Sequence, residues 1–277
     1  MSKIKDNKPI SYQGVFKSIS VIIKGGGDVA SGVAYNLYKA KIKFLILEID
    51  NPLSVRRKVS FAQAVIDGKT TVEGVTAVFA DNYEKVERIL SDNNIPVIAD
   101  TLSDAVNFFK PDIVIDATIA KKSLGLKKNI APLTIALGPG LEAGKDADVV
   151  IETNRGKNLG KIIRKGFASA NTGIPASVMG YTKERVLRAP KSGVIKNVLD
   201  IGDYVKKGDI ICYVNDAKVK SPFNGTVRGL IMNNRAVSAG LKIGDVDPRA
   251  DRQACYTISD KAHIIGKAVL KVVFDSI

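Results

Sequence analysis

The sequence contains very few of the residues that build structural metal sites and disulfides. It has two cysteines, Cys212 and Cys255, and one histidine, His263, among 277 residues. A structural zinc ion usually takes about four thiolate or imidazole ligands, so we expect no metal site. Two distant cysteines are also too few for a disulfide framework. The composition therefore predicts a fold held together by its core.

Long hydrophobic runs are also missing. No segment approaches the ~18 consecutive apolar residues that a membrane-spanning helix needs. The first residues, "MSKIKDNKPISYQG", lack the apolar stretch of a signal peptide. We therefore expect a cytoplasmic protein that makes no membrane contact.

Acidic residues are scarce relative to basic ones. The chain has 28 aspartates and glutamates against 42 lysines and arginines, which gives a net charge of +14. A basic surface attracts anions such as nucleic acid, phosphorylated cofactors or an acidic protein partner. The lysines are scattered, and "RRK" at 56–58 is the only tight cluster, which argues against nucleic acid as a partner.

What the sequence does contain, from about residue 18 to 155, is an alternation of short apolar runs with helical stretches. Strands that read as continuous apolar runs are typical of a parallel sheet buried on both faces. After an N-terminal extension (1–17), this pattern predicts an α/β domain over 18–185 with a Rossmann-like, doubly wound parallel sheet. The expected strands are 18–24, 43–49, 76–81, 95–100, 112–118, 133–137 and 148–154, and the expected helices are 28–40, 82–93 and 102–110.

The character of the chain changes after about residue 185. An internal repeat aligns 189–208 with 221–240. Two copies of one short-stranded unit predict a second, smaller β domain over 186–245, built as a barrel or sandwich from interlocking halves. The last segment, 246–277, predicts a helix followed by a short apolar strand that together pack back on the body.

The repeat domain resembles the barrel-sandwich hybrid fold of biotinyl and lipoyl domains. In "YVNDAKVKSPFNG" the candidate for a modified lysine is Lys218. The flanks that the resemblance implies, methionines for biotin or an acidic pair for lipoate, are absent. We therefore interpret the domain as an unmodified structural or partner-binding module. Because short barrels expose edges that must be covered, it is also a candidate contact in a homo-oligomer.

The glycine cluster "KGGGDVASG" at 24–32 lies between the first expected strand and the first expected helix. In a dinucleotide-binding turn the first glycine permits the turn, the second admits the pyrophosphate, and a small third residue lets the helix pack. Gly25, Gly27 and Ala30 have that spacing, while Gly26 and Gly32 add conformational freedom. The predicted cofactor-binding turn comprises Gly25, Gly26, Gly27, Asp28, Val29 and Ala30.

The next expected strand ends near Glu48. This position follows Gly27 by about 20 residues, the separation at which an acidic group can hydrogen-bond ribose hydroxyls. The acid favours NAD over NADP, whereas Arg56 and Arg57 in the following loop could favour an extra phosphate. NAD or a molybdopterin-type dinucleotide is the expected cofactor. A flavin, another pterin nucleotide, S-adenosylmethionine and a vestigial, empty turn all remain open.

Several loops at the predicted carboxyl ends of strands border the same crevice. Arg56 and Arg57 either clamp a phosphate or belong to a solvated basic loop. Gly138 and Gly140, in "GPGLEAGKD", either form an anion-binding nest or simply let the chain turn. Arg155 follows the last expected strand of the sheet and is predicted to face the crevice.

Three stretches, 51–75, 136–163 and 240–270, resemble the selenium-dependent molybdenum hydroxylase system proteins. That family is similar to the accessory factors that mature xanthine dehydrogenase. The resemblance covers nearly the whole chain from about residue 20. It implies a role in maturing a molybdenum hydroxylase, with the hydroxylase apoprotein as partner. The family pattern implies a histidine within "ETNRGKNLG", where this sequence has Lys157.

Other readings of the chain remain open, including whether it is an enzyme. A small NAD-dependent oxidoreductase would need a proton relay, and His263 lies far from the glycine turn in sequence. A nucleotide-sensing module would bind without catalysis. Asp116, at a strand end, either faces a substrate or binds a loop amide. The family resemblance also raises a persulfide on Cys255, although no histidine lies nearby in sequence to lower its pKa.

Overall fold

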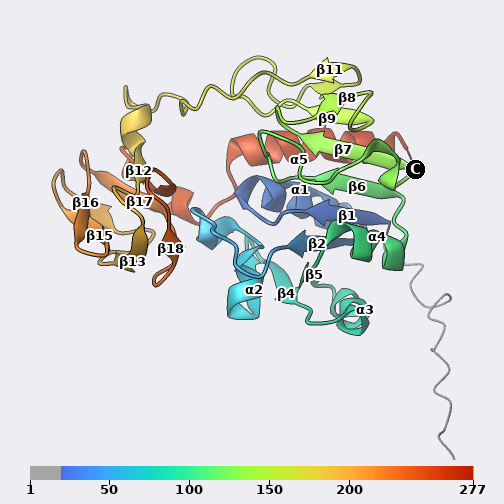
Figure 1. Ribbon diagram of the computed structural model, residues 1–277, viewed down its shortest axis with the longest axis horizontal. Coiled ribbons are helices and arrows are strands. Elements are labelled where there is room, and N and C mark those ends of the chain that lie inside the picture. The colour runs from blue at the N-terminus through green and yellow to red at the C-terminus, as the bar shows by residue number, and fades with distance from the viewer. Residues whose placement is uncertain (1–19, 277) are drawn as a thin grey trace, which may run out of the picture.

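The computed structural model describes residues 20–276, so the expected extension, 1–17, lies outside the described residues. Figure 1 shows an α/β body and a smaller β unit at one end of it, joined by an extended segment between β11 (Gly166–Phe167) and β12 (Val186–Arg188). Among the described residues, none of the helices combines the length and apolarity that crossing a membrane requires.

The body is built on a nine-stranded sheet with the order β10-β9-β7-β6-β1-β2-β5-β4-β3. Its seven central strands run parallel, and only the edge strands β3 and β10 are antiparallel to their neighbours. The protein is therefore a mixed α/β protein with a mostly parallel sheet. The strands are β1 (Val21–Lys24), β2 (Phe44–Glu48), β3 (Lys69–Val72), β4 (Val75–Phe79), β5 (Ile95–Ala99), β6 (Ile113–Asp116), β7 (Leu133–Leu137), β9 (Val149–Ile151) and β10 (Ile162–Ile163).

All seven strands and all three helices predicted before residue 155 are present. Strands β3 and β10 were not predicted, because they are short edge strands without a continuous apolar run. A separate two-stranded sheet pairs β8 (Glu142–Ala143) with β11. The helices are α1 (Asp28–Lys39), α2 (Gln63–Asp67), α3 (Tyr83–Ser91), α4 (Leu102–Phe109) and α5 (Asp260–Phe274).

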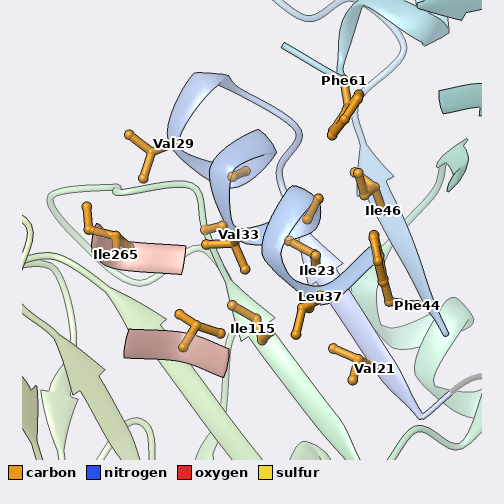
Figure 2. Close-up of a cluster of buried hydrophobic side chains, with 14 of the residues drawn as sticks. Val21, Ile23, Val29, Val33, Leu37, Phe44, Ile46, Phe61, Ile115 and Ile265 are labelled. Atoms are coloured by element: carbon orange, nitrogen blue, oxygen red, sulfur yellow. The ribbon is translucent and has the colours of Figure 1, made fainter. Parts of the chain in front are cut away.

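Successive residues of each central strand face opposite sides of the sheet, as strand geometry requires. In β1, Ile23 packs with α1 and α5 on one face, while Ile22 packs with α3 and α4 on the other. Figure 2 shows part of the first of these clusters, which includes Val33 of α1, Ile115 of β6 and Ile265 of α5. The two layers of helices bury the sheet on both faces.

The C-terminal segment corrects one prediction. The expected helix followed by a short strand is a single helix, α5, of 15 residues. Its apolar end stays helical because Val269, Val272 and Val273 are buried at helical spacing. The helix packs closely on α1, since a Cβ atom on Gly32 would lie 2.6 Å from the Cβ atom of Ala262.

The β unit consists of two four-stranded antiparallel sheets with the orders β12-β19-β17-β14 and β16-β15-β13-β18. The alignment that places 189–208 on 221–240 also converts the strands of one sheet into those of the other in the same order. Each repeat gives two strands to each sheet, so both sheets combine strands from both repeats. The remaining strands are β13 (Gly193–Asn197), β14 (Tyr204–Val205), β15 (Ile210–Val214), β16 (Ala217–Lys220), β17 (Gly225–Leu230), β18 (Ala236–Val237) and β19 (Lys242–Asp247).

Candidate functional site

The candidate site lies at the carboxyl ends of the parallel strands, where the strand order reverses. From β1 the chain moves to β2 on one side, and it later returns to β6 on the other side of β1. In open α/β sheets, ligands bind in the crevice outside such a switch point. The turn after β1, the end of β2 and the loops after β6, β7 and β9 all meet at this edge.

The three glycines of the turn after β1 differ in whether backbone conformation or close packing excludes a larger residue. Gly25 has a φ of +93°, a conformation that other residues rarely adopt. A Cβ atom on Gly26 would lie 2.8 Å from the backbone nitrogen of Ala62. Gly27 has ordinary extended angles, φ −64° and ψ −179°, and a Cβ atom there would meet nothing within 4 Å. Among residues 20–276, neither the backbone conformation nor a close contact requires glycine at position 27.

Gly27 is also the N-cap residue of α1. The first N–H groups of a helix have no intrahelical acceptor, and the helix dipole makes this end favourable for anions. Val29 and Ala30 are buried under this first turn. The carboxylate of Asp28 lies 3.6 Å from a terminal nitrogen of Arg56, so part of its negative charge is offset.

Glu48, at the end of β2, points its carboxylate at the turn. It accepts hydrogen bonds from the backbone N–H groups of Gly26, over 2.7 Å, and Ile49, over 2.9 Å. A carboxylate offers about four lone-pair sites, so these two bonds leave it able to accept a further donor such as a hydroxyl group.

Arg56 and Arg57 have protein partners. Buried Arg56 donates to the carbonyl oxygens of Ala254 and Thr257, each over 3.0 Å, and burial lowers its pKa. Arg57 donates to the carbonyl oxygen of Leu230 over 3.1 Å and pairs with Asp200. These bonds fasten the loop after β2 to the β unit and to the segment before α5. They favour a structural role, and the phosphate clamp stays a prediction.

Gly138 and Gly140 let two loops pack together. The N–H of Gly138 donates to the carbonyl oxygen of Ile151 over 3.0 Å, so it is not free for an anion. A Cβ atom on Gly140 would lie 2.0 Å from the carbonyl oxygen of Ala120, in the loop after β6. This geometry supports the plain-turn interpretation of both glycines.

Asp116 ends β6 and is buried. It accepts hydrogen bonds from the backbone N–H of Thr118, over 3.1 Å, and from the Thr118 hydroxyl, over 2.5 Å. The amine of Lys24 lies 3.6 Å from its other oxygen. The carboxylate therefore binds a loop amide, which was one of its two predicted roles.

The loop after β9 is tied to the start of α5. Arg155 forms a two-pronged ion pair with Asp260, both bonds 2.7 Å long, which holds the pKa of Asp260 far below its usual range. Buried Glu152 accepts N–H groups of Asn154 and Ser169, each over 2.7 Å. Burial alone raises the pKa of Glu152, but these hydrogen bonds outweigh it and keep the pKa low.

Lys261, in the first turn of α5, is a site residue that the sequence did not indicate. Burial lowers its pKa, while the nearby carboxylates of Asp28 and Glu152 act in the opposite direction. In the part of the chain that the structure describes, its amine forms no ion pair. No local pattern distinguishes this lysine, because only the packing of α5 on α1 brings it near Asp28.

The cysteines and the histidine offer little chemistry at this edge. Cys255 is buried with its sulfur 3.7 Å from the carbonyl oxygen of Val227, and burial raises its pKa, which argues against a reactive thiolate and hence against the persulfide hypothesis. Cys212 is a core residue whose pKa burial raises to about 12. His263 packs on the ring of Tyr35. Tyr35 lies about 12 Å along α1 from Gly27, so the imidazole is away from the glycine turn.

Metal ligands and the candidate carrier lysine, Lys218, were the other features of the sequence that bear on a cofactor. Among residues 20–276, no three histidine, cysteine or carboxylate side chains gather as metal ligands would. The tip of the β15–β16 hairpin is formed by Asn215 and Asp216, while Lys218 lies within β16 opposite Tyr213. This placement agrees with an unmodified β unit, because a carrier lysine would project from the tip.

The chain matches no protein-family model. It is 47% identical over 251 residues to the uncharacterized protein YqeB of Escherichia coli K12, a match that covers 91% of this chain and 46% of YqeB. The chain thus spans about half the length of this relative.

Solved structures give only distant likenesses. An aspartoacylase family protein from Mesorhizobium loti is 15% identical, with a TM-score of 0.28 over 83% of this chain and 85% of that one. The ectoine utilization protein EutE from Ruegeria pomeroyi is 12% identical, with a TM-score of 0.27 over the same shares. At such TM-scores these likenesses carry no argument about function.

Proposed function

We propose that this chain is a maturation factor for a molybdenum hydroxylase, selenium-dependent as the sequence resemblance implies. In this proposal the body is a Rossmann-like domain that holds a nucleotide-containing cofactor of the molybdopterin dinucleotide type at the glycine turn. The β unit is a barrel-sandwich module without a prosthetic group. The partner is the hydroxylase apoprotein, which receives the cofactor in the cytoplasm.

The observation that carries the ligand proposal is the environment of Gly27. The fold itself requires glycine at two of the three positions: Gly25 has a positive φ, and Gly26 lies too close to Ala62 for a side chain. Gly27 has no such explanation, and it caps α1 beside open space. A glycine in this position lets a phosphate approach the backbone N–H groups of the helix end.

Two side chains fit the same ligand. The carboxylate of Glu48 is fixed beside the turn and retains capacity to accept a ribose hydroxyl. The half-buried Lys261 forms no ion pair among the described residues, so its amine is available to a ligand phosphate. Holding and releasing such a cofactor requires binding groups and no proton relay, which agrees with the position of His263 away from the turn.

The melting temperature of the pure protein, measured with each candidate ligand added, tests which ligand binds. The candidates are NAD, NADP, FAD, S-adenosylmethionine, CTP and molybdopterin species. A ligand at a hundredfold excess over its dissociation constant stabilises the native state by about 2.7 kcal/mol. We expect a molybdopterin-type nucleotide to raise the melting temperature. Gly27→Ala should abolish this shift and lower the unliganded stability by no more than about 1 kcal/mol, because its methyl group meets only open space and alanine is a poorer N-cap than glycine.

Lys58→Ala, in the neighbouring loop, is the matched control and should keep the full shift. No shift with any ligand would contradict the proposal, and sustained NADH turnover would favour an oxidoreductase instead.

Maturation is tested in a strain that lacks the gene for this protein. We expect hydroxylase activity to be lost while the amount of apoprotein stays normal, and wild-type protein to restore activity where Gly27→Ala does not. Full hydroxylase activity without this protein would overturn the maturation role, even if the purified chain binds a nucleotide.

A further inference from the structure

The β unit contains a groove between equivalent positions of its two repeats. It has a volume of about 290 Å³ and is lined from both β12 and β16. Its walls pair equivalent residues of the two repeats: Leu187 with Val219, Arg188 with Lys220, and Pro190 with Pro222. The groove therefore lies where the two interlocking halves face each other.

Both strands that line the groove are sheet edges. Within residues 20–276, β12 pairs only with β19, and β16 pairs only with β15. Each strand thus has one edge whose backbone N–H and C=O groups have no neighbouring strand. Such an edge readily pairs with an extended polypeptide, which adds a strand to the sheet.

The groove has a basic rim, which we define as the exposed side chains of Arg188, Lys218 and Lys220. Leu187 and Val219 also line it, but they are buried and belong to the core of the β unit. The one acidic residue in its lining, Glu184, already accepts a hydrogen bond of 2.8 Å from the Thr182 N–H. A neighbouring hollow of about 300 Å³, which shares Arg188, adds the basic side chain of Lys183.

We propose that this groove binds an extended, acidic polypeptide segment of a partner protein by strand addition along β12 or β16. The basic rim selects acidic side chains, and the free edges select a polypeptide backbone over nucleic acid. A second copy of this chain is disfavoured because each copy has a net charge of +14. The chain's own N-terminal segment, 1–19, is also unsuited, since it contains four lysines and one aspartate. This inference does not depend on the nucleotide site.

The test measures binding of a fluorescein-labelled peptide of alternating glutamate and valine to the full chain by fluorescence anisotropy. We expect saturable binding, with backbone amide NMR shifts concentrated in 184–190 and 217–222. A peptide of alternating glutamate and proline lacks half of its N–H donors and should bind at least about tenfold more weakly, as should one of alternating lysine and valine.

The double variant Lys218→Glu/Lys220→Glu should raise the dissociation constant about tenfold. Lys206→Glu/Lys207→Glu makes the same charge change at exposed positions of the β unit outside the groove, and it should raise the constant less than about twofold. Equal losses in both variants would overturn the proposal, because they would show nonspecific attraction to a basic protein. Stronger binding of a single-stranded oligonucleotide at the same residues would overturn it as well.

Discussion

The carboxylate of Glu48 accepts a hydrogen bond of 2.7 Å from the backbone N–H of Gly26, so the end of β2 is tied to the turn after β1. A second bond of 2.9 Å to the N–H of Ile49 fixes the carboxylate from its own side. The residue predicted to bind a ribose thus also shapes the turn predicted to bind the phosphate. The two roles can be separated by mutation.

Removal of this carboxylate should destabilise the protein even without a ligand. Glu48→Ala leaves the N–H of Gly26 without its acceptor, and we expect the free energy of unfolding to fall by about 1–3 kcal/mol. Glu48→Gln keeps an acceptor oxygen and should lose less than about half of that. Urea unfolding of wild type and both variants without ligand measures the free energy of unfolding. A Glu48→Ala variant as stable as wild type would contradict the hydrogen bond.

Gly32→Ala should destabilise the contact between α1 and α5. In an exposed helix this change stabilises by up to about 1 kcal/mol. Here the new Cβ atom would lie 2.6 Å from the Cβ atom and the carbonyl oxygen of Ala262, and overpacking of this kind costs about 1–3 kcal/mol. The sign of the change in unfolding free energy is the measurement. A more stable Gly32→Ala protein would rule out the close contact.

Arg56→Ala tests whether this arginine is structural. Its removal leaves the carbonyl oxygens of Ala254 and Thr257 without their donor, so we expect a loss of about 3 kcal/mol in unfolding free energy without any ligand. Arg56→Lys should also be destabilised, because an ammonium group cannot reproduce the spread of the guanidinium donors. If either variant keeps wild-type stability and loses only nucleotide affinity, the phosphate-clamp interpretation is correct.

The Arg155–Asp260 ion pair should make stability depend on pH in the acidic range. The pKa of Asp260 is lower in the folded protein than its unfolded value of about 3.9, so the contribution is complete above that pH and is lost as pH falls. Asp260 is 68% exposed, so solvent screening limits the contribution to about 1 kcal/mol.

Asp260→Asn should therefore be less stable than wild type at pH 7, and the difference should shrink progressively below about pH 4. Denaturant unfolding of both proteins across this range measures it. A difference that stays constant down to about pH 2 would assign the effect to something other than this ion pair.

The strands of the sheet were predictable because a strand buried on both faces is a continuous apolar run, as in Phe44–Glu48 and Leu133–Leu137. The edge strand Lys69–Val72 was not, since an exposed edge carries polar residues like those of a loop. The end of α5 was misread as a strand because "VLKVVF" is rich in β-branched residues. Burial against α1 keeps this segment helical.

The loops that were predicted to border the crevice do lie together at one edge of the sheet, but the contacts of their side chains were not predictable from the sequence. Gly26 and Gly32 were interpreted as adding conformational freedom to the turn. In the structure Gly26 allows a close approach to Ala62, and Gly32 allows one to Ala262. Arg57 was predicted as a candidate phosphate ligand, and the structure adds a hydrogen bond from its side chain to the carbonyl oxygen of Leu230 in the β unit. Lys261 was not considered, because it lies near the other end of the chain from the glycine turn.

The sequence alone determined where the central strands and principal helices lie and that the β unit consists of two repeats. These features follow from local periodicity and from self-similarity along the chain, which need no knowledge of distant contacts. The tertiary structure decided which glycines allow a close approach and which arginines donate to carbonyl oxygens, and it decided that Lys261 lies near Asp28. The partner of a polar side chain is set by which distant segments fold against it, and no local pattern encodes that choice.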